Sequence, residues 1–527
     1  MRSALLVVAS ARSFALLATC AWAAACSAST ETPPPEATPT YEPVALPVLT
    51  TAKTTLDRTI VPKKAPGTNP DVTKYLFDAD VRASFLSAGF GDFDFGPPDG
   101  TTERSPPNMS APAPGPNKHV LTRFVHMPDL QLADDEAPTR LVRLDSSGPT
   151  SGAYRPQESA GCRVVNAAVR TINALHKTAP IDFVLLGGDN ADNAQDNEVG
   201  WVLDILGGAP RVECDSGADD DPVKGAGNDA KDPFVAPGLA MPFYWVNGNH
   251  DVLVQGNFVV NADYERRVLG TSSSVGTIDW RLKGGGIGFD DLPADPRRKH
   301  LRPPEVLGKV AAHKGGHGLS ATQAKTGRAF FTFDIPNTPF RFVVLDTAAA
   351  NSGGAEGVMR KSEVDQYVKP ALDQAKAEGK LVLLASHHAL SSLTDGSGLG
   401  GVKVDDAMTQ DAYRAFLGGY DNVLFSLVGH THEHRVRYEA PPGGHGFWEV
   451  MTSALADFPQ QIRIIELIDD DNGWLRLRAT LADYATDGDP VAAEARKLGI
   501  LDLTTGWTPI GTGTASDRNV ELLIKKP

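Results

Sequence analysis

The stretch VLFSLVGHTHEH (residues 423–434) joins a run of strand-forming residues to a turn that carries three histidines. The whole chain of 527 residues has only 13 histidines, so this cluster stands out from the background. Neutral imidazole is the commonest metal ligand in proteins. The stretch therefore predicts a buried strand that ends in a metal site, provided that other strands supply further ligands.

Four other apolar runs also end in side chains that can bind a metal. They are VLTRFVHMPD, DFVLLGGD, PFYWVNGNH and LVLLASHH, which end at Asp129, at Asp189, at Asn249 and His250, and at His387 and His388. Each run is short and rich in strand formers, and Gly, Pro, Asn or Asp bound it, as is typical of buried strands. A single ending of this kind reflects the preference of Asp and Asn for turns. Five of them in one chain predict that the strand ends converge on one place.

Helical patterns lie between these strands. Residues 162–178 (CRVVNAAVRTINALHKT) repeat apolar residues at intervals of three and four, and so do residues 361–379 apart from their proline. Strands that alternate with helices indicate an α/β fold in which helices cover the sheet. In such folds, binding and catalytic groups gather beyond the carboxyl ends of the strands.

Taken in order, the strand endings resemble the motifs of the calcineurin-like metallophosphoesterases. The motifs are D-x-Q at 129–131, G-D-x-x-D at 188–192, G-N-H-D at 248–251, H-H at 387–388 and G-H-x-H at 429–432. The resemblance covers about residues 120–435. It implies a four-layer α/β/β/α sandwich of two mixed β-sheets flanked by helices, with two metal ions a few ångströms apart.

The same resemblance implies a set of metal ligands. Asp189 would bridge both ions; Asp129, Gln131 and His432 would complete one site, and Asn249, His387 and His430 the other. In the H-H pair His388 is the less favoured ligand, and His434 lies outside the motif, as an outer or surface residue. Mixed nitrogen and oxygen ligands suit Mn, Fe or Zn better than calcium, which prefers oxygen ligands alone.

Two such ions can clamp a phosphate and lower the pKa of a bound water to about 7, which supplies a hydroxide nucleophile at neutral pH. The resemblance assigns His250 to the phosphate or to the leaving oxygen, with Asp192 as the carboxylate that orients its imidazole. For Asp192, a helix N-cap is the alternative interpretation.

Gln131 departs from the family pattern, which normally has histidine at this position. An amide oxygen is a weaker, uncharged donor, so the ion at this site should be harder or held less tightly. The other motif residues are all present, and we interpret Gln131 as tuning the site rather than abolishing it.

Residues 1–26 have the layout of an export signal, with Arg2 and Arg12 flanking a short apolar stretch and small residues before Cys26. The end of this segment resembles a bacterial lipoprotein signal, in which the cysteine is lipidated, although Ala23 replaces the usual leucine. A lipid tether at Cys26 in the cell envelope and simple secretion both remain open. Export would permit a disulfide between Cys162 and Cys214, and two free thiols are the alternative.

The remaining segments surround the expected catalytic domain, residues 119–485. Residues 27–118 are expected to form a Pro-rich tether and an irregular lead-in, and residues 486–527 an extended C-terminal tail that packs on the domain. Alternating residues around the DNG turn at 471–473 predict a hairpin. The polar insert 207–242 is interpreted as a surface or partly disordered loop, and 269–327 as a second loop insert with a flexible lid. His313 and His317, in that second insert, are weighed as contacts to a substrate phosphate.

Composition narrows the function. The net charge of −15 argues against nucleic-acid binding, which needs a basic surface. We expect an exported metal-dependent hydrolase of phosphate mono- or diesters that uses a metal-bound hydroxide at a binuclear centre, with a small-molecule or lipid phosphoester as substrate. The alternative is a non-catalytic envelope protein of the same fold that binds metal and a phosphorylated ligand.

Overall fold

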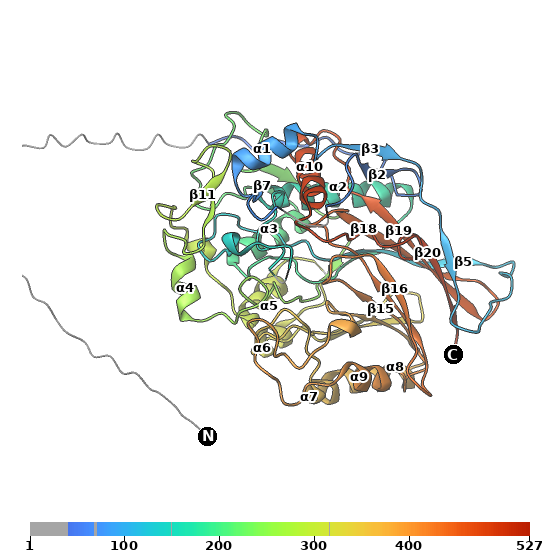
Figure 1. Cartoon of the computed structure of the whole chain (residues 1–527). Helices are drawn as coiled ribbons and strands as arrows, with labels where there is room; N and C mark the ends of the chain where they lie inside the picture. The colour runs from blue at the N-terminus through green and yellow to red at the C-terminus, as the bar shows by residue number, and fades with distance from the viewer. Residues whose placement is uncertain (1–39, 68–70, 149, 316) are drawn as a thin grey trace, which may run out of the picture. The chain divides into compact units, whose positions relative to one another are not determined.

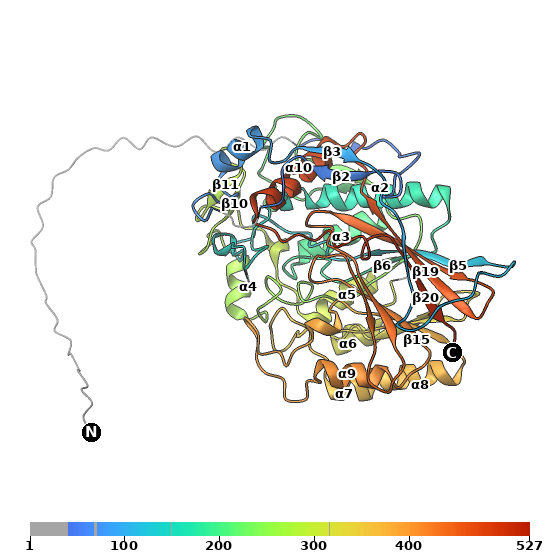
Figure 2. The same cartoon turned by 45° about the vertical axis from the view of Figure 1, so that its right-hand side comes forward.

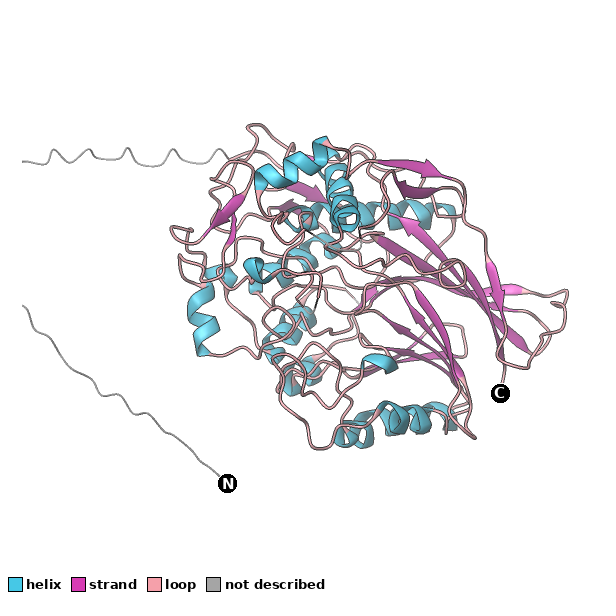
Figure 3. Cartoon of the chain, in the orientation of Figure 1, coloured by secondary structure: helices cyan, strands magenta, loops and turns pink. Residues whose placement is uncertain are grey.

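Two mixed β-sheets lie face to face at the centre of the structure, a computed structural model (Figure 1). It describes residues 40–67, 71–148, 150–315 and 317–527, so the predicted export signal and the start of the tether lie outside the described residues. Figure 3 shows the layers as helices, sheet, sheet and helices. The predicted four-layer α/β/β/α sandwich is confirmed.

The first sheet has seven strands, in the order β4-β20-β19-β18-β5-β6-β9. Their bounds are β4 (Thr102–Arg104), β20 (Val520–Lys525), β19 (Trp474–Asp483), β18 (Gln461–Asp469), β5 (His119–Met127), β6 (Val184–Leu186) and β9 (Phe243–Tyr244). Strands β5, β6 and β9 are parallel, so their carboxyl ends share one edge. Strands β18 and β19 form the antiparallel hairpin predicted around the DNG turn.

The second sheet has six strands, in the order β12-β13-β14-β15-β17-β16. Their bounds are β12 (Phe331–Asp334), β13 (Phe340–Val344), β14 (Leu381–Ala385), β15 (Val423–Val428), β17 (Phe447–Met451) and β16 (Arg435–Glu439). Strands β13, β14, β15 and β17 are parallel, and the two outer strands are antiparallel. All five strands predicted to end in ligands are therefore present, three in the first sheet and two in the second.

Alternation along the strands explains the layers. On β14, Leu383 and Ala385 face the core between the sheets, whereas Val382 and Leu384 face the outer helices. Successive side chains of a strand point to opposite faces, so a strand that is apolar throughout must be covered on both sides. The apolar runs of the sequence meet this requirement.

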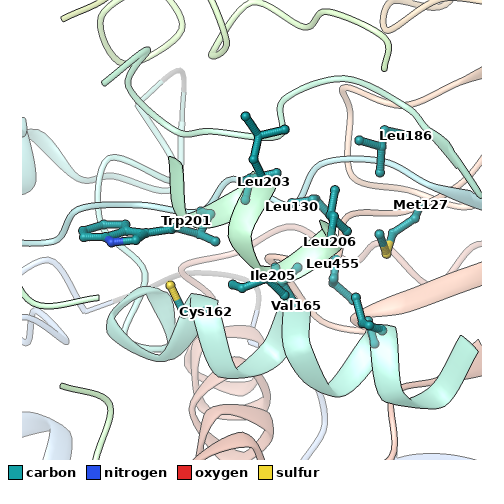
Figure 4. Packing of buried hydrophobic residues seen from close by; sticks show 14 of the residues in the cluster. Met127, Leu130, Cys162, Val165, Leu186, Trp201, Leu203, Ile205, Leu206 and Leu455 are labelled. Atoms are coloured by element: carbon teal, nitrogen blue, oxygen red, sulfur yellow. The ribbon is translucent and has the colours of Figure 1, made fainter. Parts of the chain in front are cut away.

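Helices cover the outer faces of both sheets (Figure 2). The first sheet is covered by α2 (Gly161–Thr178), α3 (Asp196–Gly207) and α10 (Pro490–Thr505), and the second by α7 (Lys361–Glu363), α8 (Lys369–Ala377) and α9 (Gln410–Leu417). Figure 4 shows part of the first interface, where Val165 of α2 and Ile205 of α3 belong to one apolar cluster with Met127 and Leu186. The proline-containing helix predicted at 361–379 continues through a π-helical segment at Val364–Val368, next to Pro370.

The remaining elements lie outside the two main sheets. They are β1 (Val44–Ala45), β2 (Thr59–Pro62), β3 (Phe93–Gly96), β7 (Ala209–Val212), β8 (Phe234–Ala236), β10 (Thr277–Asp279) and β11 (Gly286–Gly288), with α1 (Ala79–Ser87), α4 (Ala262–Val268), α5 (Pro303–Ala312) and α6 (Ala321–Thr326). None of the described helices is long and apolar enough to span a membrane.

Three expectations about the surrounding segments are wrong. The C-terminal extension is not an extended tail, because it forms α10 and the sheet strand β20; Asp489 caps α10, Pro490 begins it and Gly506 ends it. The insert at 269–327 is not a flexible lid throughout, since Val306 and Leu307 of α5 pack into the core. The insert at 207–242 is only in part a solvated loop: it holds β7 and β8, and Asp215, Asp220 and Asp232 are buried. Cys214 of this insert forms a disulfide with Cys162 of α2.

Candidate metal centre

The two sheets present their ligand-bearing strand ends to each other. The first sheet contributes Asp129 after β5, Asp189 after β6, and Asn249 and His250 after β9; the second contributes His387 after β14, and His430 and His432 after β15. Asp129, Asp189, Asn249 and His387 are each at most 1% exposed. Side chains far apart in the sequence thus meet at one buried point between the sheets.

Asp129, Asp189 and His387 form the heart of this cluster. Each offers a ligand atom within 4.8 Å of those of the other two. His387 Nε2 lies 3.0 Å from Asp189 Oδ2 and 3.9 Å from Asp129 Oδ1. His432 approaches from the far side, with its Nε2 3.4 Å from Asp129 Oδ1. These spacings suit atoms that surround a shared cation.

Ligand atoms of His387, His388 and His430 form a second group with the same spacing. His388 is nevertheless engaged elsewhere: its Nδ1 lies 2.8 Å from the Thr347 hydroxyl, and its Nε2 lies 2.8 Å from the carbonyl oxygen of Ala355. Neither nitrogen of His388 is therefore free to bind an ion. This leaves His387 and His430 as the nitrogen donors of this group.

Several donor atoms in the centre are buried without a hydrogen-bond partner. Among the described residues, Gln131 Oε1 and Asn249 Oδ1 lack one, and His387 Nε2 has only its ion-pair contact with Asp189 Oδ2. An unpaired buried polar atom costs about 1–3 kcal/mol, so native proteins rarely keep several together without a ligand. Metal ions that take these lone pairs would remove the cost. The donor set, carboxylates with amide oxygens and imidazoles, fits transition-metal ions.

The backbone around the centre is strained. Asp129, Gln131, Asp189, His430 and His432 all have positive φ angles, between 38° and 79°. This left-handed region is unfavourable for residues with a side chain, and such strain concentrates at functional sites. The strained residues follow β5, β6 and β15, the strands that carry Asp129, Asp189 and the two histidines of the Gly-His-x-His motif.

Two glycines of the motifs are required by close approach. A Cβ atom on Gly248 would lie 2.0 Å from Asp189 Oδ1, and one on Gly429 would lie 2.5 Å from Asp129 Oδ2. Any other residue at either position would therefore displace a candidate ligand. The Gly-Asn-His-Asp and Gly-His-x-His motifs thus have a steric reason as well as a chemical one.

The carboxylates control the charge of the nearby imidazoles. Burial alone lowers the pKa of His387, but Asp189 and Asp129 raise it to about 9. Burial acts in the same way on His432, while Asp129 and Asp457 raise its pKa to about 10. Without metal, both imidazoles are therefore doubly protonated and positively charged at pH 7. Their positive charge takes the place of a metal ion.

We expect metal affinity to rise with pH, because an imidazole must lose its proton before it can bind an ion. With one proton released from His387 and one from His432, the apparent affinity should rise up to about 100-fold per pH unit below pH 9 and level off above pH 10. Calorimetric metal titrations in buffers of different ionisation enthalpy would count the protons. Affinity independent of pH between 6 and 8 would contradict this prediction.

The same shifts affect stability with the opposite sign. Both pKa values lie above the ordinary histidine value of 6.5, so the two imidazoles stabilise the metal-free fold most below pH 6.5. This contribution is lost as the pH rises through 9 and 10.

His250 lies at the rim of the centre. Its backbone N–H donates to Asp189 Oδ1 at 2.8 Å, and its Nδ1 lies 2.7 Å from the carbonyl oxygen of Asp192 and 3.3 Å from Asp192 Oδ1. Burial lowers the pKa of His250, but Asp189 and Asp192 raise it above the ordinary value. With Nδ1 held by Asp192, Nε2 remains available at the partly exposed face of the ring. Asp192 is not a helix N-cap, since Gln195 caps α3.

Asp192 is held in place by two buried arginines, Arg140 and Arg155. Arg140 Nη1 donates to Asp192 Oδ2, and Arg155 Nη1 lies 3.8 Å from Asp192 Oδ1. Burial raises the pKa of Asp192, but Arg140, His250 and Arg155 lower it to about 2. The carboxylate therefore stays ionised and favours the protonated form of His250.

Asp457 is a site residue that the sequence did not reveal. Its Oδ2 lies 2.5 Å from His432 Nδ1, while its Oδ1 accepts a hydrogen bond from Arg155 at 2.7 Å. A carboxylate behind a metal-binding imidazole fixes the tautomer and orientation of the ring. The only sequence signal is an acidic residue in the buried ALADFP stretch that follows β17.

Three other histidines lie away from the donor cluster. His434 is buried: its Nε2 lies 2.9 Å from Gln461 Oε1, and its Nδ1 accepts from Arg463. It is therefore not a surface residue. His313 lies against Gly207 at the end of α3, and His317 lies near Phe243 at the start of β9. The site residues Asn249 and His250 instead follow the carboxyl end of β9.

No model of a known protein family matches the sequence, and no curated protein matches it. Several solved structures resemble the fold. A dimetal phosphatase from Danio rerio is 13% identical, with 70% of this chain and 100% of that chain covered and a TM-score of 0.38. A sulfate thiohydrolase from Thermus thermophilus is 15% identical (72% and 60% covered, TM-score 0.31). A purple acid phosphatase from yellow lupin seeds is 12% identical (74% and 55% covered, TM-score 0.33). With TM-scores below 0.5, these likenesses carry no weight in assigning a function, which must rest on the site itself.

Proposed function

We propose that the chain is a metal-dependent phosphoesterase that hydrolyses phosphate mono- or diesters at a binuclear centre. The observation that carries this proposal is the convergence of candidate donor atoms from five strand ends, some of them without hydrogen-bond partners. Gln131 Oε1 and Asn249 Oδ1 are buried without hydrogen-bond partners, and Asp129, Asp189 and His387 offer ligand atoms within 4.8 Å of one another. A purely structural polar core would pair these atoms with one another.

The donors divide into two sets that share one carboxylate. Asp189 would contact both ions, with Asp129, Gln131 and His432 on one side and Asn249, His387 and His430 on the other. Two divalent or trivalent ions (Mn, Fe or Zn) would supply positive charge for a phosphate and a water acidic enough to react near neutral pH. Asp457 would hold the His432 ring in the tautomer that leaves Nε2 toward the ion.

His250 supplies the proton chemistry of the proposed reaction. Asp192 orients the ring and favours its protonated form, with Nε2 at the partly exposed rim where a phosphate oxygen or leaving oxygen would arrive. A general acid in this position protonates the departing oxygen as the bond to phosphorus breaks. His430 and His432 are also partly exposed, which supports an approach of substrate from this side.

The alternative is a binding protein of the same fold that holds metal and a phosphorylated ligand without turnover. The complete His250–Asp192 pair favours the hydrolase, because binding alone does not require an imidazole that a carboxylate positions as an acid. Export, and a membrane tether through lipidated Cys26, remain part of the proposal for the mature protein.

The decisive experiment is metal analysis of the purified mature protein together with a substrate panel. Aryl phosphates, bis-aryl phosphates, nucleotides and phospholipids should each be tested with added Mn²⁺, Fe²⁺ or Zn²⁺. We expect about two ions per chain and metal-dependent turnover of at least one class. Two bound ions with no turnover of any substrate would favour the binding protein, and no bound ion would exclude both.

Gln131→His should raise the occupancy of the ion held with Asp129 and His432, or shift its preference toward a softer metal. Imidazole is a stronger donor than an amide oxygen, so we expect affinity to rise about tenfold at that site. Titration of the metal-free variant, with elemental analysis, measures this change. Unchanged metal content and unchanged activity would show that Gln131 is not a ligand.

A further inference from the structure

A second set of acidic side chains, three of them buried and one half-buried, lies outside the proposed catalytic centre. It joins the insert at 207–242 to the segment that follows Gln131. Its members are Glu136, Asp215, Asp219 and Asp220, and one oxygen of each lies within 4.8 Å of one oxygen of every other member. Asp215 and Asp220 are 3% and 6% exposed. Carboxylates at such spacing repel one another strongly unless protons or a cation intervene.

The oxygens of this cluster are largely unpaired. Among the described residues, both Oδ1 and Oδ2 of Asp220 lack a hydrogen-bond partner, and so do Oδ1 of Asp215 and Oδ1 of Asp219. Asp220 is more than nine-tenths buried. Its backbone N–H donates to Asp215 Oδ2, but its side-chain oxygens accept no hydrogen bond. A side chain that is fully desolvated in this way points to a ligand that accepts its lone pairs.

The basic groups nearby do not satisfy the cluster. Lys231 Nζ bonds Asp135 Oδ1 and Glu136 Oε2, each at 2.8 Å, and so takes up one edge. Arg281 Nε comes no closer than 3.8 Å to Asp219 Oδ2 and is bound to Asp279. Burial, with the neighbouring carboxylates, raises the pKa of Asp215 to about 8 and that of Asp219 to about 6. Carboxylates this close together cannot all stay ionised unless a cation lies among them, and Lys231 is the only described base in close contact with one of them.

We propose that Glu136, Asp215, Asp219 and Asp220 bind a calcium ion that is separate from the catalytic metals. The described donors of the cluster are all oxygens, which Ca²⁺ prefers, whereas Zn²⁺ and Fe take nitrogen or sulfur more readily. Asp220 has two free oxygens and can bind in a bidentate manner, as one carboxylate commonly does in calcium sites. Three of the four ligands come from one short loop, residues 215–220, which is also typical of calcium sites.

The acidic group next to this site serves as an internal contrast. Asp221, Asp229 and Asp232 are also within 4.8 Å of one another. Asp229 and Asp232, however, accept backbone N–H groups of their own turn at 2.9–3.3 Å. These carboxylates close a turn and carry no further inference.

The site links the insert to the catalytic centre. Glu136 lies five residues after Gln131 and four before Arg140, which holds Asp192. The disulfide between Cys162 and Cys214 fixes the chain next to Asp215. A calcium ion would tie the insert to this segment, so its loss should loosen the 131–140 stretch as well as the insert.

Terbium luminescence and calorimetry test the proposal on the full chain stripped of metals. Trp280 Nε1 donates to Asp135 Oδ2 at 2.8 Å, so its indole lies beside the site and should sensitise a bound Tb³⁺ ion. We expect Ca²⁺ to bind once at this cluster, to displace Tb³⁺, and to raise the melting temperature by about 3 °C at saturation. Trp280→Phe should lose the luminescence while calorimetric Ca²⁺ binding remains.

Variants separate this site from the rest of the protein. Asp220→Asn should weaken Ca²⁺ binding by about tenfold or more, since it removes the charge and one of two oxygens. Asp232→Asn, in the neighbouring turn, should bind Ca²⁺ as the parent does. Asp189→Asn, which disables the proposed catalytic centre, should also retain Ca²⁺ binding, so the two proposals can fail independently. Absence of Ca²⁺ binding at millimolar concentration, or Asp220→Asn binding as tightly as the parent, would overturn the calcium site.

Discussion

Asp189→Asn is expected to lower phosphoesterase activity by about three orders of magnitude and to remove at least one of the two metal ions. A carboxylate has two oxygens and can bridge two cations, whereas an amide offers one oxygen and an N–H group that repels them. Asp189 Oδ2 lies 3.0 Å from His387 Nε2, and Oδ1 accepts the backbone N–H of His250. The substitution therefore weakens both metal positions and the placement of the proposed acid.

A control on the same strand separates chemistry from folding. Asp182 lies at the opposite end of β6, where its Oδ2 accepts hydrogen bonds from the Thr122 hydroxyl at 2.6 Å and from the Arg123 N–H at 3.1 Å. Asp182→Asn should keep the metal content and the activity, even if it lowers the melting temperature. Elemental analysis and steady-state kinetics on both variants decide the matter. Asp189→Asn protein that binds two ions and turns over normally would remove Asp189 from the centre.

The sandwich could be predicted because its strands are apolar on both faces. Runs such as 381–385 and 423–428 are buried between a sheet core and a helix layer, and a strand in that position shows no polar alternation. The apolar run that predicts each strand is therefore also the feature that predicts its buried position between two layers. Helix α10 was missed for a different reason. Its Asp489–Pro490 start and Gly506 end are local signals, but the polar Gly- and Thr-rich stretch after it suggested an extended tail.

The structure of the insert at 207–242 escaped prediction because contacts between polar side chains hold much of it in place. Hydrophobic periodicity finds apolar cores, whereas Asp215, Ser216 and Lys231 are buried by contacts with other polar groups. Arg298, for instance, bonds the Ser216 hydroxyl at 2.7 Å across 82 positions of the sequence. A segment that is rich in Gly and Asp is indistinguishable by composition from a solvated loop. Only the three-dimensional partners reveal the difference.

The candidate site also has a part that the sequence predicts and a part that it does not. The residues that directly follow strands were predicted, because a motif and a strand end mark each of them, and the structure brings them together. The residues behind them were not, since Arg155 and Asp457 are 302 positions apart and share no local pattern. Asp457 contacts His432, and Arg140 contacts Asp192. The residue type at each of these positions therefore depends on a partner that is distant in the sequence. A single sequence holds no signal for such pairs.

His250→Asn should lower kcat by about 10²–10⁴-fold for esters of poor leaving groups, such as alkyl phosphates. For activated aryl phosphates the loss should be far smaller, because their leaving oxygen departs without a proton. This leaving-group dependence distinguishes a proton donor from a residue that only binds phosphate, whose loss would weaken both substrates alike. Metal content should stay at the parent level, since His250 is not among the proposed ligands.

Asp192→Asn should reproduce part of this pattern, because Asp192 acts on the substrate only through the His250 ring. It removes the charge that raises the pKa of His250, so we expect a smaller loss with the same preference for activated esters. The double variant should lose little more than His250→Asn alone, as residues that act as a unit are not additive.

His119→Gln, at the exposed start of β5, is the matched control and should leave both substrates unaffected. Equal losses for alkyl and aryl esters in His250→Asn would show that the ring binds phosphate without donating a proton. Additive losses in the double variant would show that Asp192 acts independently of it.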